Sequence, residues 1–252
     1  PEAVEYHYGE AHLWDQAAPL WLRAGQRDVA RSANLEAIAH LSKGIETVRQ
    51  MPPGREASSI ELDLQISLGS ARIADSGYSS KETEAAYLRG RALIDEIGGD
   101  LRQFAVLHGL CMLYWNRARH ARMGEVAQDM LERANGQNES LPRLVAHRVI
   151  AVGLDPMGRF EMAHDHAKKA VELYEREPPQ DSAHQFGHDQ GVGAYWHLSI
   201  PLLFLGRCDA AAAAGAHASS LARDLNNATT GAYDSLWAAF TSLVRGDWEA
   251  AR

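Results

Sequence analysis

The sequence predicts an all-α fold, a right-handed superhelical solenoid of antiparallel helix pairs. Three observations support this prediction. A residue that can end a helix recurs along the chain, mostly every 40 to 48 residues, and small apolar residues follow it at fixed offsets. No run of alternating apolar and polar residues is long enough to favour a strand over a helix. Solenoids with one helix pair per repeat have periods of roughly 34 to 47 residues, so each repeat is expected to be one hairpin.

The repeat is clearest after Gly158 and Gly206, where small residues follow the glycine by five, nine and twelve positions. These residues are Ala163, Ala167 and Ala170 in one repeat, and Ala211, Gly215 and Ala218 in the next. Small side chains let two helices approach closely, and glycine lets the chain leave one helix and enter another. The equivalent turn positions are His12, Ser32, Gly77, Ala118, Gly158, Gly206 and Gly246, with gaps of 20, 45, 41, 40, 48 and 40 residues.

Helical patterns fill the spaces between these turns. Asn34 is predicted to cap a helix that ends before Pro52, and Ser79 or Ser80 to cap one that ends at Gly98. The further predicted helices cover residues 55–75, 101–117, 119–134, 141–157, 160–174, 194–205, 208–225 and 229–245. Pairs of bulky residues precede three of the turns, at 114–115, 195–196 and 236–237. They either fill the seam between repeats or line a ligand groove.

One segment, residues 178–193, interrupts the rhythm. The repeat that holds it is 48 residues long, against 40 for its neighbours, so the segment is interpreted as an inserted loop. Insertions in solenoids cluster on one face and often bind partners. Ligand-binding or partner-binding residues are therefore predicted here, because aromatic and polar side chains can supply stacking and hydrogen bonds. They are His184, Phe186, His188, Asp189, Tyr195 and Trp196.

Composition excludes several classes of protein. A net charge of −8 argues against nucleic-acid binding, which usually needs a basic face. No stretch approaches the roughly 20 apolar residues of a membrane helix, and the N-terminus lacks the pattern of a signal peptide. Cys111 and Cys208 lie far apart in helical patterns. We expect two buried, reduced thiols, which favour a cytoplasmic location.

The residues predict no catalytic chemistry. There is no phosphate-binding Gly-x-x-x-x-Gly-Lys-Ser/Thr loop, and acidic residues are scattered at solvating spacings. His184 and His188 are four apart, as metal ligands on a helix would be, but Gly187 makes a regular helix doubtful there. Thiols in apolar helices are inert. The sequence therefore predicts no catalytic residue, metal or cofactor, and a protein that is not an enzyme.

The two ends of the sequence suggest a fragment. The chain opens within a helical pattern and stops just after the turn at Gly246. A solenoid needs a polar cap on its last apolar face. Residues 1–252 are therefore expected to form a single helical-repeat domain of a larger multidomain protein.

Four stretches carry a resemblance to a known family. They are residues 21–27 (WLRAGQR), 31–41 (RSANLEAIAHL), 77–79 (GYS) and 186–192 (FGHDQGV). In this order they resemble landmarks in the tetratricopeptide-like (TPR-like) region of bacterial signal-transduction ATPase regulators of the STAND type. Those proteins are often fused to an adenylate/guanylate cyclase domain. The family usually has Gln and Pro where this sequence has His188 and Gln190.

The resemblance implies that ATPase and cyclase chemistry belongs to upstream domains, and that this region is a sensor or protein-interaction arm. The leading hypothesis is accordingly a non-catalytic regulatory arm that binds a protein or peptide and the upstream ATPase module. The second is a small-molecule sensor that uses its concave face and the 178–193 loop. A third is a hydrolase with a metal in the histidine-rich loop. The partner and the oligomeric state stay open.

Overall fold

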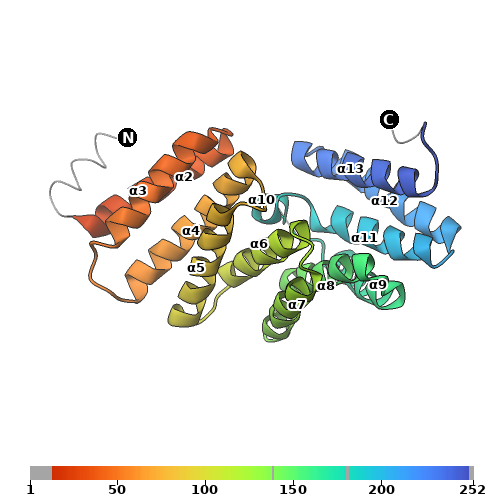
Figure 1. Cartoon of the computed structure of the whole chain (residues 1–252), viewed down its shortest axis with the longest axis horizontal. Coiled ribbons are helices and arrows are strands. Elements are labelled where there is room, and N and C mark those ends of the chain that lie inside the picture. The colour runs from red at the N-terminus through yellow and green to blue at the C-terminus, as the bar shows by residue number, and fades with distance from the viewer. Residues whose placement is uncertain (1–12, 138, 180–181, 250–252) are drawn as a thin grey trace. The chain divides into compact units, whose positions relative to one another are not determined.

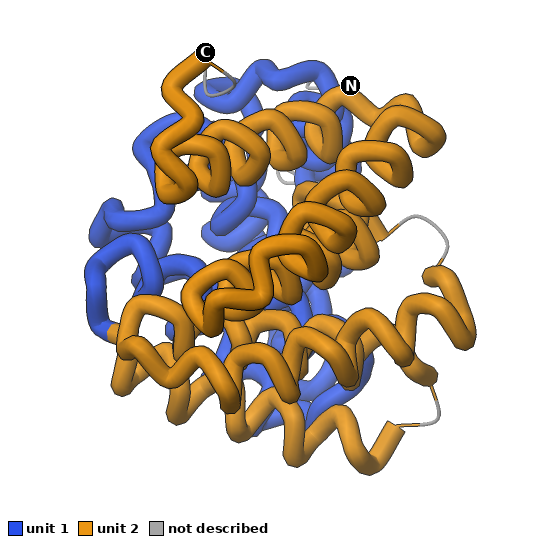
Figure 2. Tube along the Cα trace, turned by 90° about the vertical axis from the view of Figure 1, so that its right-hand side faces the viewer, with its two compact units in different colours: residues 1–119 blue, residues 120–252 orange. Residues whose placement is uncertain are grey.

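The computed structural model describes residues 13–137, 139–179 and 182–249, without the side chains of residues 184 and 185. Every regular element in these ranges is a helix, as Figure 1 shows. The prediction of an all-α helical-repeat fold is therefore confirmed. The chain divides into two compact units, residues 1–119 and 120–252, which Figure 2 colours blue and orange. His12 and Ala251 of the predicted repeat lie outside the described residues.

From residue 13 onward, the first unit consists of two hairpins and one further helix. Its helices are α2 (Trp14–Ala30), α3 (Asn34–Val48), α4 (Arg55–Ser76), α5 (Lys81–Ile97) and α6 (Arg102–Asn116). Helix α2 packs against α3, and α4 packs against both α3 and α5, while α6 follows on α5. Each helix thus contacts its neighbours along the chain, which is the contact pattern of a repeat protein.

The second unit continues the same pattern with a short helix inserted. Its helices are α7 (His120–Asn135), α8 (Ser140–Leu154), the 3-10 turn η1 (Asp155–Met157), α9 (Phe160–Arg176), α10 (Ser182–Phe186), α11 (Gln190–Phe204), α12 (Cys208–Leu225) and α13 (Ala228–Val244). Helices α8 and α9 form one hairpin and α11 and α12 the next, and α9 packs on α11. Within the described residues, no helix is long and apolar enough to cross a membrane.

The predicted turn residues share one unusual backbone conformation. Ser32, Gly77, Ala118, Gly158, Gly206 and Gly246 all have positive φ, between 53° and 80°. After five of them, the next N–H donates to the carbonyl five residues earlier, for example Arg207 N to Leu202 O at 2.9 Å. This bond defines a Schellman motif, whose left-handed residue ends the helix. Gly77 differs, because its ψ of 170° is extended. The repeat alignment is confirmed at each described position.

Small residues form the seams within and between hairpins, as predicted. Ala163, Ala167 and Ala170 on α9 are fully buried, and Ala211 and Ala218 on α12 are at most 3% exposed. In the first unit, the ring of Tyr87 on α5 lies in a slot between two glycines. A Cβ atom would lie 2.7 Å from this ring at Gly69 and 2.4 Å from it at Gly109. Tyr87 therefore packs against bare backbone on both sides.

Two local predictions are wrong. Asn34 is not the N-cap of α3: it is the first helical residue, and Ala33 precedes it without a side-chain hydrogen bond. Cys208 is exposed, whereas Cys111 is buried as predicted. Cys208 is the first residue of α12, and the amphipathic pattern that follows it did not show which face this position takes. Ser80 does cap α5, because its Oγ accepts a hydrogen bond from Thr83 N at 3.0 Å.

The prediction of a loop over residues 178–193 is also corrected. Residues 182–186 form α10, and α11 begins at Gln190 instead of residue 194. Asp189 caps α11, because its Oδ1 accepts hydrogen bonds from the N–H groups of Gly191 and Val192. Gln190 and Val192 have no exposed surface. The second half of the segment is therefore part of the protein interior.

Candidate functional site

The six predicted binding residues lie around the start of α11. Five of them have described side chains, and each is at most 8% exposed: Phe186, His188, Asp189, Tyr195 and Trp196. The side chain of His184 lies outside the described residues. Asp189 and Tyr195 make hydrogen bonds within the second unit, and Trp196 is the one of the five that lines a described pocket.

Asp189 sits at the centre of a buried polar network. Besides capping α11, its Oδ2 accepts a hydrogen bond from Ser182 Oγ at 3.0 Å. Its backbone N–H donates to Thr230 Oγ1 on α13 at 3.0 Å. The Gln190 N–H donates to Ser182 Oγ at 3.1 Å. The Asp189 carboxylate thus ties α10 to α11, and its backbone N–H adds the link to α13.

A buried arginine links this network to α8. Arg148 is 1% exposed, and its Nε donates to Gln190 Oε1 at 2.8 Å. Gln190 Nε2 in turn donates to the carbonyl of His188 at 3.0 Å. A Cβ atom at Gly193 would lie 3.0 Å from both Arg148 Cδ and His188 Nε2, so glycine makes room for the guanidinium stem. The ring of His188 stacks on Tyr233 with centroids 3.7 Å apart.

A second buried pair lies beside the first network. Asp155 Oδ2 is 4.0 Å from His197 Nδ1, and His197 Nε2 is 2.9 Å from Tyr233 Oη. Burial raises the pKa of Asp155 to about 8. Burial and the nearby Arg148 charge hold the pKa of His197 well below its usual value. Both side chains are therefore neutral at pH 7, and the pair is not a salt bridge.

The side chains of Tyr195 and Trp196, two of the predicted binding residues, have different neighbours. Tyr195 Oη donates to Glu175 Oε1 at 2.6 Å, and its ring lies against His217. Trp196 Nε1 donates to Asp234 Oδ1 at 2.9 Å, an oxygen that Ser219 Oγ also contacts. Trp196 is the predicted residue that reaches a pocket.

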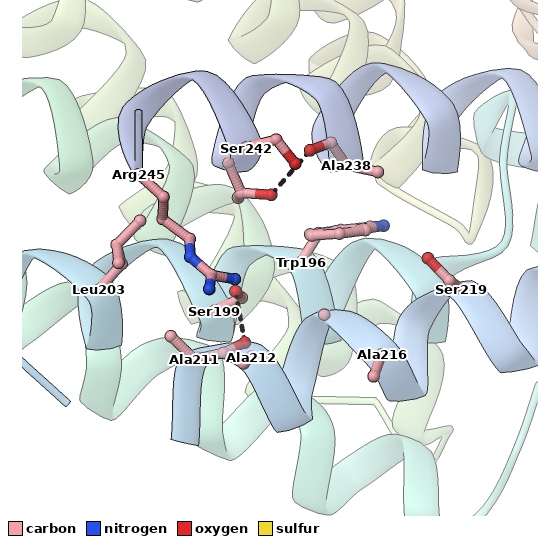
Figure 3. A pocket seen from close by; sticks show the side chains of 12 residues that line it. Trp196, Ser199, Leu203, Ala211, Ala212, Ala216, Ser219, Ala238, Ser242 and Arg245 are labelled. Atoms are coloured by element: carbon pink, nitrogen blue, oxygen red, sulfur yellow. Dashed lines mark hydrogen bonds between the residues drawn. The ribbon is translucent and has the colours of Figure 1, made fainter. Parts of the chain in front are cut away.

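This pocket lies where α11, α12 and α13 meet, and Figure 3 shows it. Its volume is about 190 Å³. The residues that line it are Trp196, Ser199, Leu203, Ala211, Ala212, Gly215, Ala216, Ser219, Ala238, Thr241, Ser242 and Arg245. Alanines and hydroxyl side chains make up most of the wall, with one aromatic ring and one guanidinium group.

The sequence of α12 explains why space remains here. Its first turns contain a run of alanines, residues 210–214, so no large side chain extends toward α13. Trp196 enters the gap against Gly215, where a Cβ atom would lie 2.9 Å from the indole ring. Sequence reasoning missed Arg245 and the serines. The alanine run was visible, but its orientation toward α13 was not.

A second surface feature is a stacked aromatic pair. The rings of Phe160 and Phe204 are nearly parallel, 6° apart in plane and 4.6 Å between centroids. Phe160 follows the turn of one hairpin and Phe204 precedes the turn of the next, so the pair joins two repeats. Phe204 is 49% exposed, and Met157 and Met162 nearby in the chain are 47% and 43% exposed.

Helix α13 also exposes apolar side chains, including one at a position whose equivalent in the preceding repeat is buried. Leu236, ten residues before Gly246, is 63% exposed. Trp196, ten residues before Gly206, is 4% exposed because it packs against Gly215 of α12. The exposed face of α13 is therefore equivalent to the face of α11 that packs against α12.

Histidines form one close pair outside these regions. His147 Nδ1 on α8 and His166 Nδ1 on α9 are 3.0 Å apart. Burial and the neighbouring histidine lower the pKa of His147 to about 4, so the two rings are neutral hydrogen-bonding partners at pH 7. The described residues contain no group of three or more His, Cys, Asp or Glu side chains that could hold a metal ion.

Comparisons with known proteins support the fold. No family model matches the chain. Among solved structures, a kinesin-light-chain-like protein of Podospora anserina with nearly identical TPR-like repeats is similar, with a TM-score of 0.63 and 12% identity. This match covers 85% of the present chain and 99% of that one. The fold is TPR-like. BtubC from P. vanneervenii is similar with a TM-score of 0.61 and 16% identity, over 85% of each chain.

One relative matches in sequence. An uncharacterized protein of Rhizobium meliloti (strain 1021) is 27% identical over 255 residues, which make up 98% of the present chain and 24% of that protein. The chain thus spans about a quarter of the length of this relative. The ATPase and cyclase context stays a prediction.

Proposed function

We propose that this chain is a non-catalytic protein-interaction module, the regulatory arm of a larger bacterial signalling protein. The TPR-like fold supports the interaction role by analogy, because stacked helix pairs present extended binding surfaces. The much greater length of the Rhizobium relative supports a place within a larger protein. The resemblance of four stretches to STAND-type regulators supports an upstream ATPase module as one binding partner.

The observation that carries the proposal is the stacked pair of Phe160 and Phe204, in which the Phe204 ring is half-exposed. Buried apolar surface contributes about 25 cal/mol per Å², so a stacked ring left half in water favours a partner that covers it. Aromatic side chains are enriched among residues that dominate binding energy in interfaces. Because the pair joins two hairpins, a partner that covers it would also hold those hairpins in one arrangement. We assign this surface to a protein segment with an apolar anchor residue.

Site-specific photo-crosslinking tests the assignment. The photoreactive amino acid p-benzoyl-phenylalanine replaces Phe204 in the full-length parent protein, and irradiation in cells links it to whatever covers the site. The same amino acid at Leu35, which is 70% exposed on α3, is the matched control. We expect a defined crosslinked peptide from position 204 and none of the same identity from position 35.

The affinity of the identified partner then decides between outcomes. Phe204→Glu should weaken its binding by roughly tenfold or more, as for a central aromatic anchor, while Leu35→Glu leaves it unchanged. A crosslink within an ATPase-type region of the parent chain supports the regulatory role, and a crosslink to another protein identifies a separate partner. Equal crosslinks from both positions, or unchanged affinity in Phe204→Glu, would refute the proposed surface.

The second candidate function is a sensor of a small molecule. The pocket between α11, α12 and α13 favours it, because the pocket contains Trp196 and an arginine side chain within one unit. The 178–193 segment is less suited to close on an effector, because much of its described part is committed to the buried network around Asp189.

A further inference from the structure

The pocket at α11, α12 and α13 combines three features that suit one class of ligand. It has an aromatic wall at Trp196, hydroxyl groups such as that of Ser199, and a guanidinium group at Arg245. Figure 3 shows the Arg245 side chain extending from α13 across the pocket toward Ser199 and the alanines of α12. We propose that this pocket binds a small organic carboxylate with a short apolar or aromatic body. The inference deepens the sensor candidate and rests on it.

The positive charge of Arg245 favours a negatively charged ligand. Arg245 is an exposed residue at the rim of the pocket and is the only charged side chain among the residues that line it, although the protein as a whole carries a net charge of −8. The planar guanidinium fork matches a carboxylate, to which it can donate two parallel hydrogen bonds. Asp234, the nearest acid on α13, already accepts hydrogen bonds from Trp196 Nε1 and Ser219 Oγ. A carboxylate ligand in the pocket would therefore replace water as the partner of the Arg245 guanidinium.

The lining residues and the volume of the pocket limit the size and polarity of the uncharged part of the ligand. About 190 Å³ corresponds to roughly six water molecules and lies below the roughly 300 Å³ at which drug-sized sites begin. The apolar part of the wall consists of methyl groups, Leu203 and the Trp196 ring, against which a flat or short aliphatic body can pack. Ser199 Oγ donates its proton to the Ala211 carbonyl at 2.8 Å, so Arg245 and not this hydroxyl is the donor available to an acidic group. The ligand is thus a single ring or short chain with one acidic group.

Such a ligand would contact two neighbouring repeats at once. Ala238 belongs to α13 and Arg245 is the residue that follows its end, whereas Ala212 and Ala216 belong to α12. At the pocket, α12 presents alanines and a glycine toward α13, which leaves a space beside Trp196 that a ligand can fill. A bound carboxylate would fill the gap and pair with Arg245, which favours the arrangement with α13 held against α12. Slower hydrogen exchange of α13 amides is the expected sign.

The experiment uses benzoate and hexanoate as probes, with benzamide as the uncharged match of benzoate and inorganic phosphate as an anion without an apolar body. Titration calorimetry measures affinity, and hydrogen exchange locates the protected helix. Arg245→Gln removes the charge, and Ala216→Leu fills the pocket from an exposed position. Arg223→Gln and Ala213→Leu are the controls, because both side chains are exposed on α12 and lie outside the lining of the pocket.

We expect saturable binding of at least one carboxylate, with benzamide and phosphate weaker. Because a hydrogen bond to a charged group contributes about 1.5–3 kcal/mol, Arg245→Gln should weaken binding by roughly tenfold to 150-fold. Ala216→Leu should abolish binding, and both controls should bind as the unchanged protein does. Absence of binding of either carboxylate, or equal binding in Arg245→Gln, would overturn the assignment. Binding that persists in Ala216→Leu would place a sensor site elsewhere, and the Phe204 crosslink tests the interaction function independently of either result.

Discussion

The slot around Tyr87 offers the sharpest test of how the hairpins pack. Its ring lies between Gly69 on α4 and Gly109 on α6, and it is 5% exposed. Substitution Gly109→Ala would place a Cβ atom 2.4 Å from the ring, about 1 Å closer than ordinary van der Waals contact. The ring has little room to move, because it is buried and also lies close to Gly69, where a Cβ atom would be 2.7 Å from it.

Two opposing effects determine how much Gly109→Ala changes the free energy of unfolding. Alanine in a helix interior is better than glycine by about 1 kcal/mol. Overpacking a full core costs about 1–3 kcal/mol, and sometimes more where no side chain can yield. Because the ring is buried and lies close to two glycines, we expect the upper end, so Gly109→Ala should lower the free energy of unfolding by about 2 kcal/mol. Gly124→Ala on α7 is the control, because a Cβ atom there meets nothing within 4 Å. It should raise the stability by about 0.5–1 kcal/mol.

Urea unfolding followed by circular dichroism measures both variants, and hydrogen exchange of α5 and α6 amides assigns the loss to the first unit. In a Tyr87→Leu background the smaller side chain leaves room, so the cost of Gly109→Ala should shrink markedly. Equal signs for Gly109→Ala and Gly124→Ala, or an undiminished cost in the Tyr87→Leu background, would show that this slot does not fix the packing of the three helices.

Three further predictions follow from single residues. Ala118 has φ of 53°, so Ala118→Gly should raise stability by about 1 kcal/mol and Gly206→Ala should lower it by a similar amount, both measured by urea unfolding. Asp189→Ala should lower the free energy of unfolding by about 2 kcal/mol or more, because a helix cap and a buried hydrogen-bond network are lost together. Ser80→Ala, which removes a cap alone, should lower it by about 1 kcal/mol. Equal losses in the two variants would contradict the role of the network. Burial raises the pKa of Asp155 from 3.8 to about 8, so the folded protein binds more protons than the unfolded chain between these values. Its stability should therefore fall as pH rises through this range, and Asp155→Asn should flatten the fall in thermal melts; an unchanged slope would contradict the raised pKa.

The turns and seams could be predicted from sequence because they depend on local chemistry. A left-handed helix end favours glycine, and close helix contact favours small residues, so both leave a periodic trace. Ser32 and Ala118 were found by spacing alone, although neither residue type favours positive φ. Helix 208–225 was predicted with the bounds that the structure has.

Features that depend on distant partners could not be predicted. Gln190 is buried because Arg148, 42 residues earlier, donates a hydrogen bond to it, and Asp189 meets Thr230, 41 residues later. Sequence reasoning interpreted these polar residues as an exposed binding loop, since polar side chains near prolines and glycines usually indicate one. The pocket was missed for a related reason. The pocket is a space that the small side chains between α12 and α13 leave unfilled. The periodic pattern of the sequence does not show which side chains of one helix face the other helix.

The central claim is that this chain is a series of similar hairpins, each with one residue of positive φ at the turn between its two helices. NMR chemical shifts and the coupling between amide and α protons measure φ directly at Ser32 and Ala118, the two turn positions without glycine. Positive φ near 58° and 53° at these residues is the predicted result. Right-handed helical φ at either of them would mean that the chain does not turn there, and the repeat would be wrong.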